Sequence, residues 1–370
     1  MTHRDHPYRN RPDYAYWRRS VAEAPAGELD PFVSGAFTIG RRESVATAGS
    51  CFAQHIGRYL KAGGSNYMVT EAPHPVLTDK GALAANYGVF SARYGNIYTA
   101  RQLVQLFDRA YGRFAPREDV WQESGRVFVD PFRPNIQRGG FNSEREFHLD
   151  RERHFRAVRE MFENMDVFVF TLGLTEAWRS KADGAIFPVC PGVAGGTFSA
   201  DNHEFINFGV DDVAADMRDF IAKLTAVNRR VRIILTVSPV PLAATAENRH
   251  VLVSTIYSKS VLRVVCDMLA RALPNVVYFP SYEIIASGHA GHYFADDQRT
   301  IREEGVAHVM RVFARHFLTG SEDSALFARA RRTLDVIRGA ESQPPTNEAA
   351  ALEAAFKAMC DEEALDRPFD

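Results

Sequence analysis

The stretch Gly49-Ser50-Cys51-Phe52-Ala53 joins a short apolar segment to an amphipathic one. Residues 44–48 are mostly apolar and carry β-branched side chains at Val45 and Thr47, as in a buried parallel strand. Residues 52–60 repeat apolar side chains at three- and four-residue spacing before two glycines, as in a helix. The pattern therefore predicts Ser50 at the carboxyl end of a strand and the amino end of a helix.

This position suits a nucleophile, because N–H groups at a helix N-terminus are unpaired and the helix dipole stabilises negative charge. A serine there can also serve only as an N-cap, which is a structural role. Cys51 is a further candidate nucleophile, since a helix N-terminus lowers the pKa of a thiol. Its side chain is expected to point away from that of Ser50 and into the sheet.

Strand and helix patterns alternate along the rest of the chain. Further strands are predicted over residues 66–70, 167–172, 232–237 and 276–279, and helices over residues 99–107, 149–165, 211–227, 254–273 and 301–316. This alternation predicts a five-stranded parallel sheet in a three-layer α/β/α sandwich. Right-handed crossovers would bring the carboxyl ends of all strands to one edge, where ligands bind. Irregular stretches over residues 71–98, 114–142 and 187–209 are expected to form the walls of that site.

Three parts of the chain differ in pattern. Residues 1–30 form an N-terminal arm, which we expect to pack across the domain surface. Residues 31–318 form the α/β domain. Residues 319–370 form a helical extension in which no chemistry is apparent, so docking or homo-oligomerisation is its expected role.

Bulk composition narrows the class of protein. The formal net charge is −2 and no basic stripe is present, which argues against nucleic-acid binding. No run approaches the ~18 to 20 apolar residues of a membrane span, and no secretory signal is apparent. The four cysteines, which include no Cys-x-x-Cys pair, favour neither a zinc site nor a disulfide framework. We therefore expect a cytoplasmic protein without a metal.

The pentapeptide at Ser50 resembles the signature of the GSCFA family, which is named after it and is placed among the SGNH, or GDSL-like, hydrolases. The resemblance runs from about residue 31 to residue 318. It implies a five-stranded, flavodoxin-like sandwich and an ester hydrolase or acyltransferase with Ser50 as nucleophile. The implied substrate is a small-molecule or glycan ester, and no cofactor is needed. The first block of the superfamily is Gly-Asp-Ser, so Gly49 stands here in place of the Asp.

The same resemblance suggests donors for the oxyanion. Gly95 lies where the superfamily has a glycine that donates its N–H, and Asn96 could add a side-chain amide; a simple turn with positive φ explains this pair equally well. Thr175 stands where the superfamily has an oxyanion Asn. Glu176, beside it, faces the same sheet edge or only begins a helix. We expect the Ser50 N–H to be the first donor.

Of the groups that the mechanism needs, the base that accepts the proton of Ser50 has the least support in the sequence. The superfamily has Asp-x-x-His before its last helix, whereas this chain has Asp297 with Thr300 in the place of the His. His292, in the preceding loop, is the first choice because it lies near Asp297. The alternatives are His74, His289 and His308.

Two interpretations therefore remain. The first is a serine-dependent ester hydrolase or acyltransferase that uses Ser50, His292 and Asp297. The second is a degenerate fold that binds a glycan, an acylated ligand or a partner protein in the same cleft, because the usual His and oxyanion Asn are absent. Tyr257 and Lys259, at the start of the helix after the fourth strand, are expected to be exposed and available to a ligand.

Overall fold

A parallel sheet lies at the centre of the protein. The computed structural model describes residues 6–25, 27–35, 37–123, 125–288, 293–319, 361 and 365. The sheet has the order β1-β4-β8-β9, with β1 (Val45–Gly49), β4 (Val167–Leu172), β8 (Arg232–Val237) and β9 (Val276–Tyr278). All its neighbouring strands run parallel. The predicted α/β class with a parallel sheet is confirmed.

The fifth predicted strand, at residues 66–70, forms only a single parallel bridge between Tyr67 and Val45. The N–H of Met68 donates to the Val45 carbonyl over 2.9 Å, but the next ladder position of β1 is taken by a side chain. There the Thr47 N–H donates to Ser91 Oγ over 3.1 Å. The sheet therefore has four strands rather than five, because Ser91 takes the place of a longer partner strand at the edge of β1.

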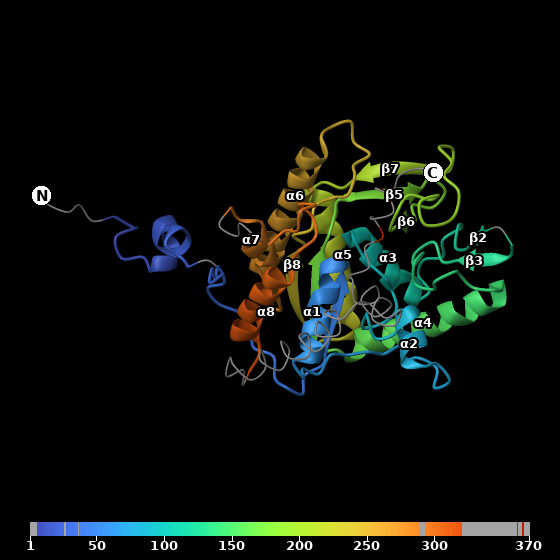
Figure 1. The fold of residues 1–370 in the computed structure, drawn as a ribbon, viewed down its shortest axis with the longest axis horizontal. Helices are drawn as coiled ribbons and strands as arrows, with labels where there is room; N and C mark the ends of the chain where they lie inside the picture. The colour runs from blue at the N-terminus through green and yellow to red at the C-terminus, as the bar shows by residue number, and fades with distance from the viewer. Residues whose placement is uncertain are drawn as a thin grey trace, which may run out of the picture.

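Helices cover both faces of the sheet (Figure 1). On one face lie α1 (Cys51–Ala62), α7 (Ser281–Ala286) and α8 (Glu303–Phe317); on the other lie α3 (Ala100–Ala110), α4 (Glu144–Asn164), α5 (Val210–Val227) and α6 (Val251–Ala272). Side chains of β4 alternate between the two cores, as strand geometry requires. Val167 and Val169 belong to the core with α1 and α8, whereas Phe168 and Phe170 belong to the core with α3 and α5.

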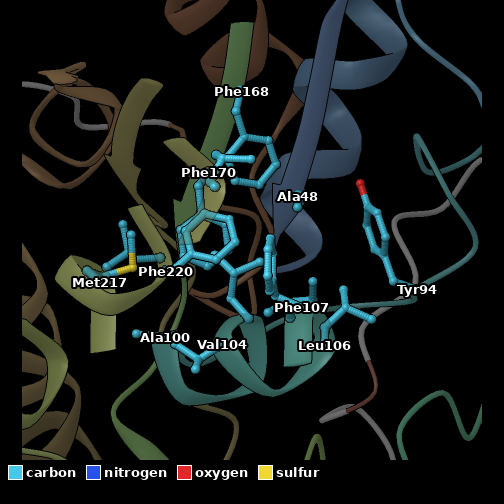
Figure 2. Packing of buried hydrophobic residues seen from close by; sticks show 14 of the residues in the cluster. Ala48, Tyr94, Ala100, Val104, Leu106, Phe107, Phe168, Phe170, Met217 and Phe220 are labelled. Atoms are coloured by element: carbon cyan, nitrogen blue, oxygen red, sulfur yellow. The ribbon is translucent and has the colours of Figure 1, made fainter. Parts of the chain in front are cut away.

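Aromatic rings dominate the second of these cores. Figure 2 shows Phe168 and Phe170 of β4 facing Phe107 of α3, with Phe220 of α5 beside them. The ring centroids of Phe168 and Phe220 lie 5.7 Å apart, and those of Phe107 and Phe220 lie 6.3 Å apart. Burial of such large rings stabilises the sheet and fixes where its strands end.

The predicted irregular stretches contain secondary structure. Residues 71–98 include α2 (Asp79–Ala84), and residues 114–142 include the hairpin of β2 (Trp121–Glu123) and β3 (Val127–Val129). A second, antiparallel sheet has the order β6-β5-β7, with β5 (Glu176–Ser180), β6 (Ile186–Phe187) and β7 (His203–Asn207). The prediction of irregular structure is wrong where α2, β2, β3 and β7 fall within residues 71–98, 114–142 and 187–209, because these elements are too short to show a clear periodicity.

The N-terminal arm and the predicted C-terminal extension flank the α/β domain in the sequence. The arm contains η1 (Asp13–Ala15) and η2 (Arg18–Ala22), neither of which has a buried residue, and Figure 1 shows them to one side of the domain. The prediction that the arm packs across the domain is wrong for these two turns. Of the predicted extension, residues 319, 361 and 365 are described, and its predicted helices lie outside the described residues.

Candidate active site at the end of β1

Ser50 lies between β1 and α1, as the sequence predicts. It occupies the N-cap position of α1 with φ −68° and ψ 178°, yet its side chain makes no capping hydrogen bond. Its Oγ is buried and has no hydrogen-bond partner among the residues that the structure describes. Capping therefore does not explain this serine. A buried polar atom without a partner is rare in proteins and requires another reason, such as chemistry.

Gly49 holds the end of β1 close against β4. Its φ is +133°, and a Cβ at this position would lie 2.2 Å from the carbonyl oxygen of Thr171. Only glycine fits there, which explains why this position carries no side chain. The close approach lets the Ser50 N–H donate to the Thr171 carbonyl over 3.1 Å. The expected first oxyanion donor is thus already engaged by β4.

Gly173, at the end of β4, permits a second close approach. A Cβ there would lie 3.0 Å from the Cβ of Ser50 and 3.1 Å from the carbonyl oxygen of Tyr98. The carbonyl of Gly173 accepts a hydrogen bond of 2.7 Å from Lys259 Nζ. Lys259 is only 1% exposed, so the prediction of an exposed lysine is wrong. Its ammonium is instead anchored to the residue that packs against Ser50.

The loop of Gly95 and Asn96 crosses the same end of β1. The Tyr94 hydroxyl donates to the Thr47 carbonyl, and the Ile97 N–H donates to the Gly49 carbonyl over 2.8 Å. Gly95 has φ +72° with open space where a Cβ would lie, so the expected positive φ is present although residues 94–97 form no regular turn. Gly95 is buried, and its N–H has no hydrogen-bond partner among the described residues. This N–H is the free donor that an oxyanion would need.

Asn96 is tied to α1 by a side-chain hydrogen bond. Gln54 Nε2, one turn beyond Ser50, donates to Asn96 Oδ1 over 2.8 Å. The structure thus brings Ser50, Gly95 and Asn96 together around the end of β1.

Thr175 and Glu176 belong to a different polar cluster. The Thr175 hydroxyl donates to Asn207 Oδ1 over 2.7 Å, and Glu176 accepts from the Thr245 hydroxyl over 2.7 Å. Glu176 begins strand β5, so the alternative of a helix start is wrong. Burial raises the pKa of Glu176, although the hydrogen bond from Thr245 works in the opposite direction. Both residues link the end of β4 to the β7 strand and the loop before α6.

Asp297 closes its own turn instead of facing Ser50 with a free carboxylate. Its Oδ2 accepts from the Thr300 hydroxyl over 2.6 Å, and its Oδ1 accepts from the N–H groups of Arg299 and Thr300. Partial burial works to raise the pKa of Asp297, but these hydrogen bonds hold it below the ordinary value. Asp297 and Thr300 therefore form an exposed hydrogen-bonded turn.

None of the described histidines among the candidates faces Ser50. His74 is exposed, and its Nδ1 accepts from the N–H of Val76. His308 is buried, and its two ring nitrogens pair with the Tyr293 hydroxyl and the Leu29 carbonyl. His289 and His292 lie outside the described residues.

Asp361, from the predicted extension, is a residue that sequence reasoning missed. Its side chain is buried against Asn96 and Tyr98 from the Gly95 loop and Asn135 from the loop after β3. Burial raises the pKa of Asp361, although the hydrogen bonds from Asn135, Asn96 and Tyr98 work in the opposite direction. No sequence signal predicts this contact, because more than 220 residues separate Asp361 from each partner.

A buried cluster of charges lies behind the Asn96 loop. Arg93 contacts Glu71 and Asp150, and Arg133 contacts Asp130 and Asp150, with N–O distances of 2.7 to 3.4 Å. Arg93 and Glu71 are each 1% exposed. Every one of these charged groups therefore has a partner of the opposite sign.

His154 extends this cluster towards the candidate site. Its Nδ1 pairs with Glu71 over 2.8 Å, while its Nε2 is buried and has no partner among the described residues. His154 and Asn96 both line a small cavity of about 20 Å³, which has room for a single water molecule. A cavity of this size cannot hold a substrate, so we treat the cluster as structural.

Two general features complete the description. Among the described residues, no helix combines the length and the apolar composition that a membrane crossing would require. Within the same residues, no group of three or more His, Cys, Asp or Glu side chains is placed to hold a metal ion.

Comparison with known proteins identifies the family of the chain. No curated protein sequence matches the chain. The sequence model of the GSCFA family matches residues 44–313, a span that begins one residue before β1 and ends within α8. It covers the Ser50 junction, the Gly95 loop and all four strands of the parallel sheet. The chain belongs to the GSCFA family.

Proposed function

We propose that this protein is a serine-dependent ester hydrolase or acyltransferase that acts on O-acyl substrates, carbohydrate esters among them. The observation that carries the proposal is the Oγ of Ser50, which is buried at a helix N-terminus without a hydrogen-bond partner among the described residues. An SGNH-like fold belongs to the same proposal. It is supported by the bridged segment at Tyr67, which lies beside β1 where a second strand of a flavodoxin-like sheet would pair.

In this proposal Ser50 Oγ attacks the carbonyl carbon of the ester and gives its proton to a base. The carbonyl oxygen becomes an oxyanion, which the N–H of Gly95 stabilises, and the alcohol leaves after it takes up the proton. Water or a second alcohol then attacks the acyl-serine, which releases the acyl group and restores Ser50. Hydrolysis and transfer differ only in this second acceptor.

His292 stays the proposed base, and the structure adds Lys259 as a second candidate. Lys259 Nζ is hydrogen-bonded to the carbonyl of Gly173, and a Cβ added to Gly173 would lie 3.0 Å from the Cβ of Ser50. Serine–lysine pairs perform the same proton transfer in other enzymes when the amine is neutral. The His292→Ala and Lys259→Met variants separate the two candidates. Only the replacement of the true base should abolish turnover of p-nitrophenyl acetate, while the far-ultraviolet circular dichroism spectrum of that variant stays unchanged.

Covalent labelling by a fluorophosphonate tests the nucleophile. We expect wild type and Cys51→Ala to be labelled, and Ser50→Ala to lose all labelling. Ser287→Ala is the matched control, because Ser287 Oγ is also buried without a partner among the described residues. Labelling that persists in Ser50→Ala but disappears in Cys51→Ala would identify a cysteine enzyme instead.

A binding module is the second candidate function, and the contact of Asp361 with the Gly95 loop favours it. A buried carboxylate bound against the Gly95 loop is also compatible with a fold that has lost its chemistry. Absence of labelling in wild type and in Asp361→Ala would support this alternative.

A further inference from the structure

Asp361 docks its carboxylate on three donors of the α/β domain. Its Oδ1 accepts from Asn135 Nδ2 over 2.6 Å, and its Oδ2 accepts from Asn96 Nδ2 over 2.9 Å and from the Tyr98 hydroxyl over 3.2 Å. Its own N–H donates to the Tyr98 oxygen over 2.9 Å. The residue is only 4% exposed. Both carboxylate oxygens are therefore recognised, together with the adjacent peptide group.

The domain holds these donors in place independently of Asp361. Asn96 is fixed by Gln54 of α1. The backbone carbonyl of Asn135 is fixed by Asn86 Nδ2 over 3.1 Å. Because the donors come from two separate loops that are each anchored elsewhere, the cradle should persist when the carboxylate is removed.

The cradle belongs to the Ser50 site. Asn96 and Tyr98 flank Ile97, whose N–H donates to the carbonyl of Gly49. The position of a Cβ on Gly173 would lie 3.0 Å from Ser50 Cβ and 3.3 Å from Tyr98 Cα, so both residues pack on one point. The loop that binds Asp361 is thus the loop that covers the end of β1.

The chemistry of the cradle selects its ligand. Asn96, Tyr98 and Asn135 offer uncharged donors to a planar group with two oxygen acceptors, and no cation among the described residues bonds to that group. We propose that these three residues form a carboxylate-binding subsite of the Ser50 site, which the chain fills with its own Asp361 and which a carboxylate-bearing substrate takes over. The role of that ligand as substrate rests on the proposed function; the binding itself does not.

Complementation by acetate tests the subsite in the full-length protein. In Asp361→Ala the cradle is empty, so acetate should bind and stabilise the folded state by mass action. We expect a saturable rise in Tm of about 1 to 3 °C beyond that given by sodium chloride at equal ionic strength. Wild type should show no such rise, and neither should the matched control Asp201→Ala, which removes an exposed carboxylate.

Two further variants keep the test decisive. Asn135→Ala combined with Asp361→Ala should lose most of the acetate response, because it removes one of the donors. Asp361→Asn preserves the shape of the side chain and serves if the alanine variant does not fold; it should show a smaller response. No acetate-specific rise in either Asp361 variant, or an equal rise in the double variant, would overturn the inference.

The same variants distinguish this inference from the proposed function. We expect fluorophosphonate to label Ser50 faster in Asp361→Ala than in wild type, because the occupant is gone. An acetate response without any labelling would leave the subsite standing and contradict the serine mechanism. Labelling of Ser50 without an acetate response would support the serine mechanism and contradict the carboxylate subsite.

Discussion

The charge cluster at Arg93 and the junction at Ser50 are both polar and both buried, but they differ in how their groups are satisfied. In the cluster, Glu71, Arg93, Arg133 and Asp130 all have partners of opposite charge, and the Nε2 of the adjoining His154 is without a partner among the described residues. At the junction, the Ser50 hydroxyl and the Gly95 N–H have none among the described residues. A saturated network stabilises a fold, whereas buried groups left without partners lower its stability and are retained when they serve a ligand. Under the proposed function, the contrast indicates a structural role for the four charged side chains and a chemical role for the junction.

The largest expected effect comes from breaking the cluster. Arg93→Met leaves the buried carboxylate of Glu71 without its guanidinium, and loss of one partner of a buried ion pair costs about 3 to 5 kcal/mol. Urea denaturation measures the free energy of unfolding. Arg156→Met is the control, since Arg156 and Glu152 form an ion pair with side chains 67% and 72% exposed and its loss should cost less than about 1 kcal/mol. Equal losses in the two variants would contradict a structural role for the cluster.

Acid should weaken the cluster next. Burial alone would raise the pKa of Glu71, but His154, Arg133 and Arg93 together lower it from 4.5 to about 2. A carboxylate with a lowered pKa in the folded state contributes stability above its unfolded pKa and loses it as the pH falls through the folded value. Between pH 4.5 and 2 this loss should reach a few kcal/mol, at about 1.4 kcal/mol per pH unit.

The Glu71→Gln variant isolates this contribution. It should be less stable than wild type near neutral pH and should show a shallower fall of unfolding free energy between pH 4.5 and 2. Urea titrations at several pH values give both slopes. Parallel slopes for the two proteins would remove Glu71 as the source of the acid sensitivity.

The smallest effect is expected at the junction itself. Ser50→Ala removes a hydroxyl that has no described partner, so the free energy of unfolding should change by less than about 1 kcal/mol or rise slightly. Thr175→Val removes a buried hydroxyl that donates to Asn207 and should cost about 1 to 2 kcal/mol. If Ser50→Ala were the more costly of the two, Ser50 would have a structural partner and the contrast between the regions would fail.

Local patterns were sufficient to predict much of the fold. The alternation of apolar strands and amphipathic helices predicted the parallel sheet, and the junction at Ser50 followed from a five-residue strand next to a helix. The strand at residues 66–70 was wrong because the apolar pattern cannot show that Ser91 takes the hydrogen bond of Thr47. The exposed lysine was wrong because helix periodicity near Lys259 does not reveal the carbonyl of Gly173 that binds it.

The sequence predicted only those parts of the candidate site that lie within local motifs. Gly95 and Asn96 were singled out by resemblance, and the structure brings their loop to the end of β1, where the Ile97 N–H donates to the Gly49 carbonyl. Asp361 and Asn135 could not have been predicted, because their contact joins segments 226 residues apart. Asp297 was assigned to the site by resemblance, whereas its carboxylate accepts hydrogen bonds from Thr300 and Arg299 within its own turn. Tertiary contacts of this kind leave no periodic pattern in a sequence.

Peptide mapping of the labelled protein tests the central claim, that Ser50 is the reactive residue, most directly. The wild-type chain is treated with a fluorophosphonate, digested with trypsin and fragmented in a mass spectrometer; cleavage after Arg42 and Arg58 gives a peptide that contains both Ser50 and Cys51. We predict one phosphonate adduct per chain, on Ser50. An adduct on Cys51, on Ser287 or on any residue outside residues 43–58 would contradict the account.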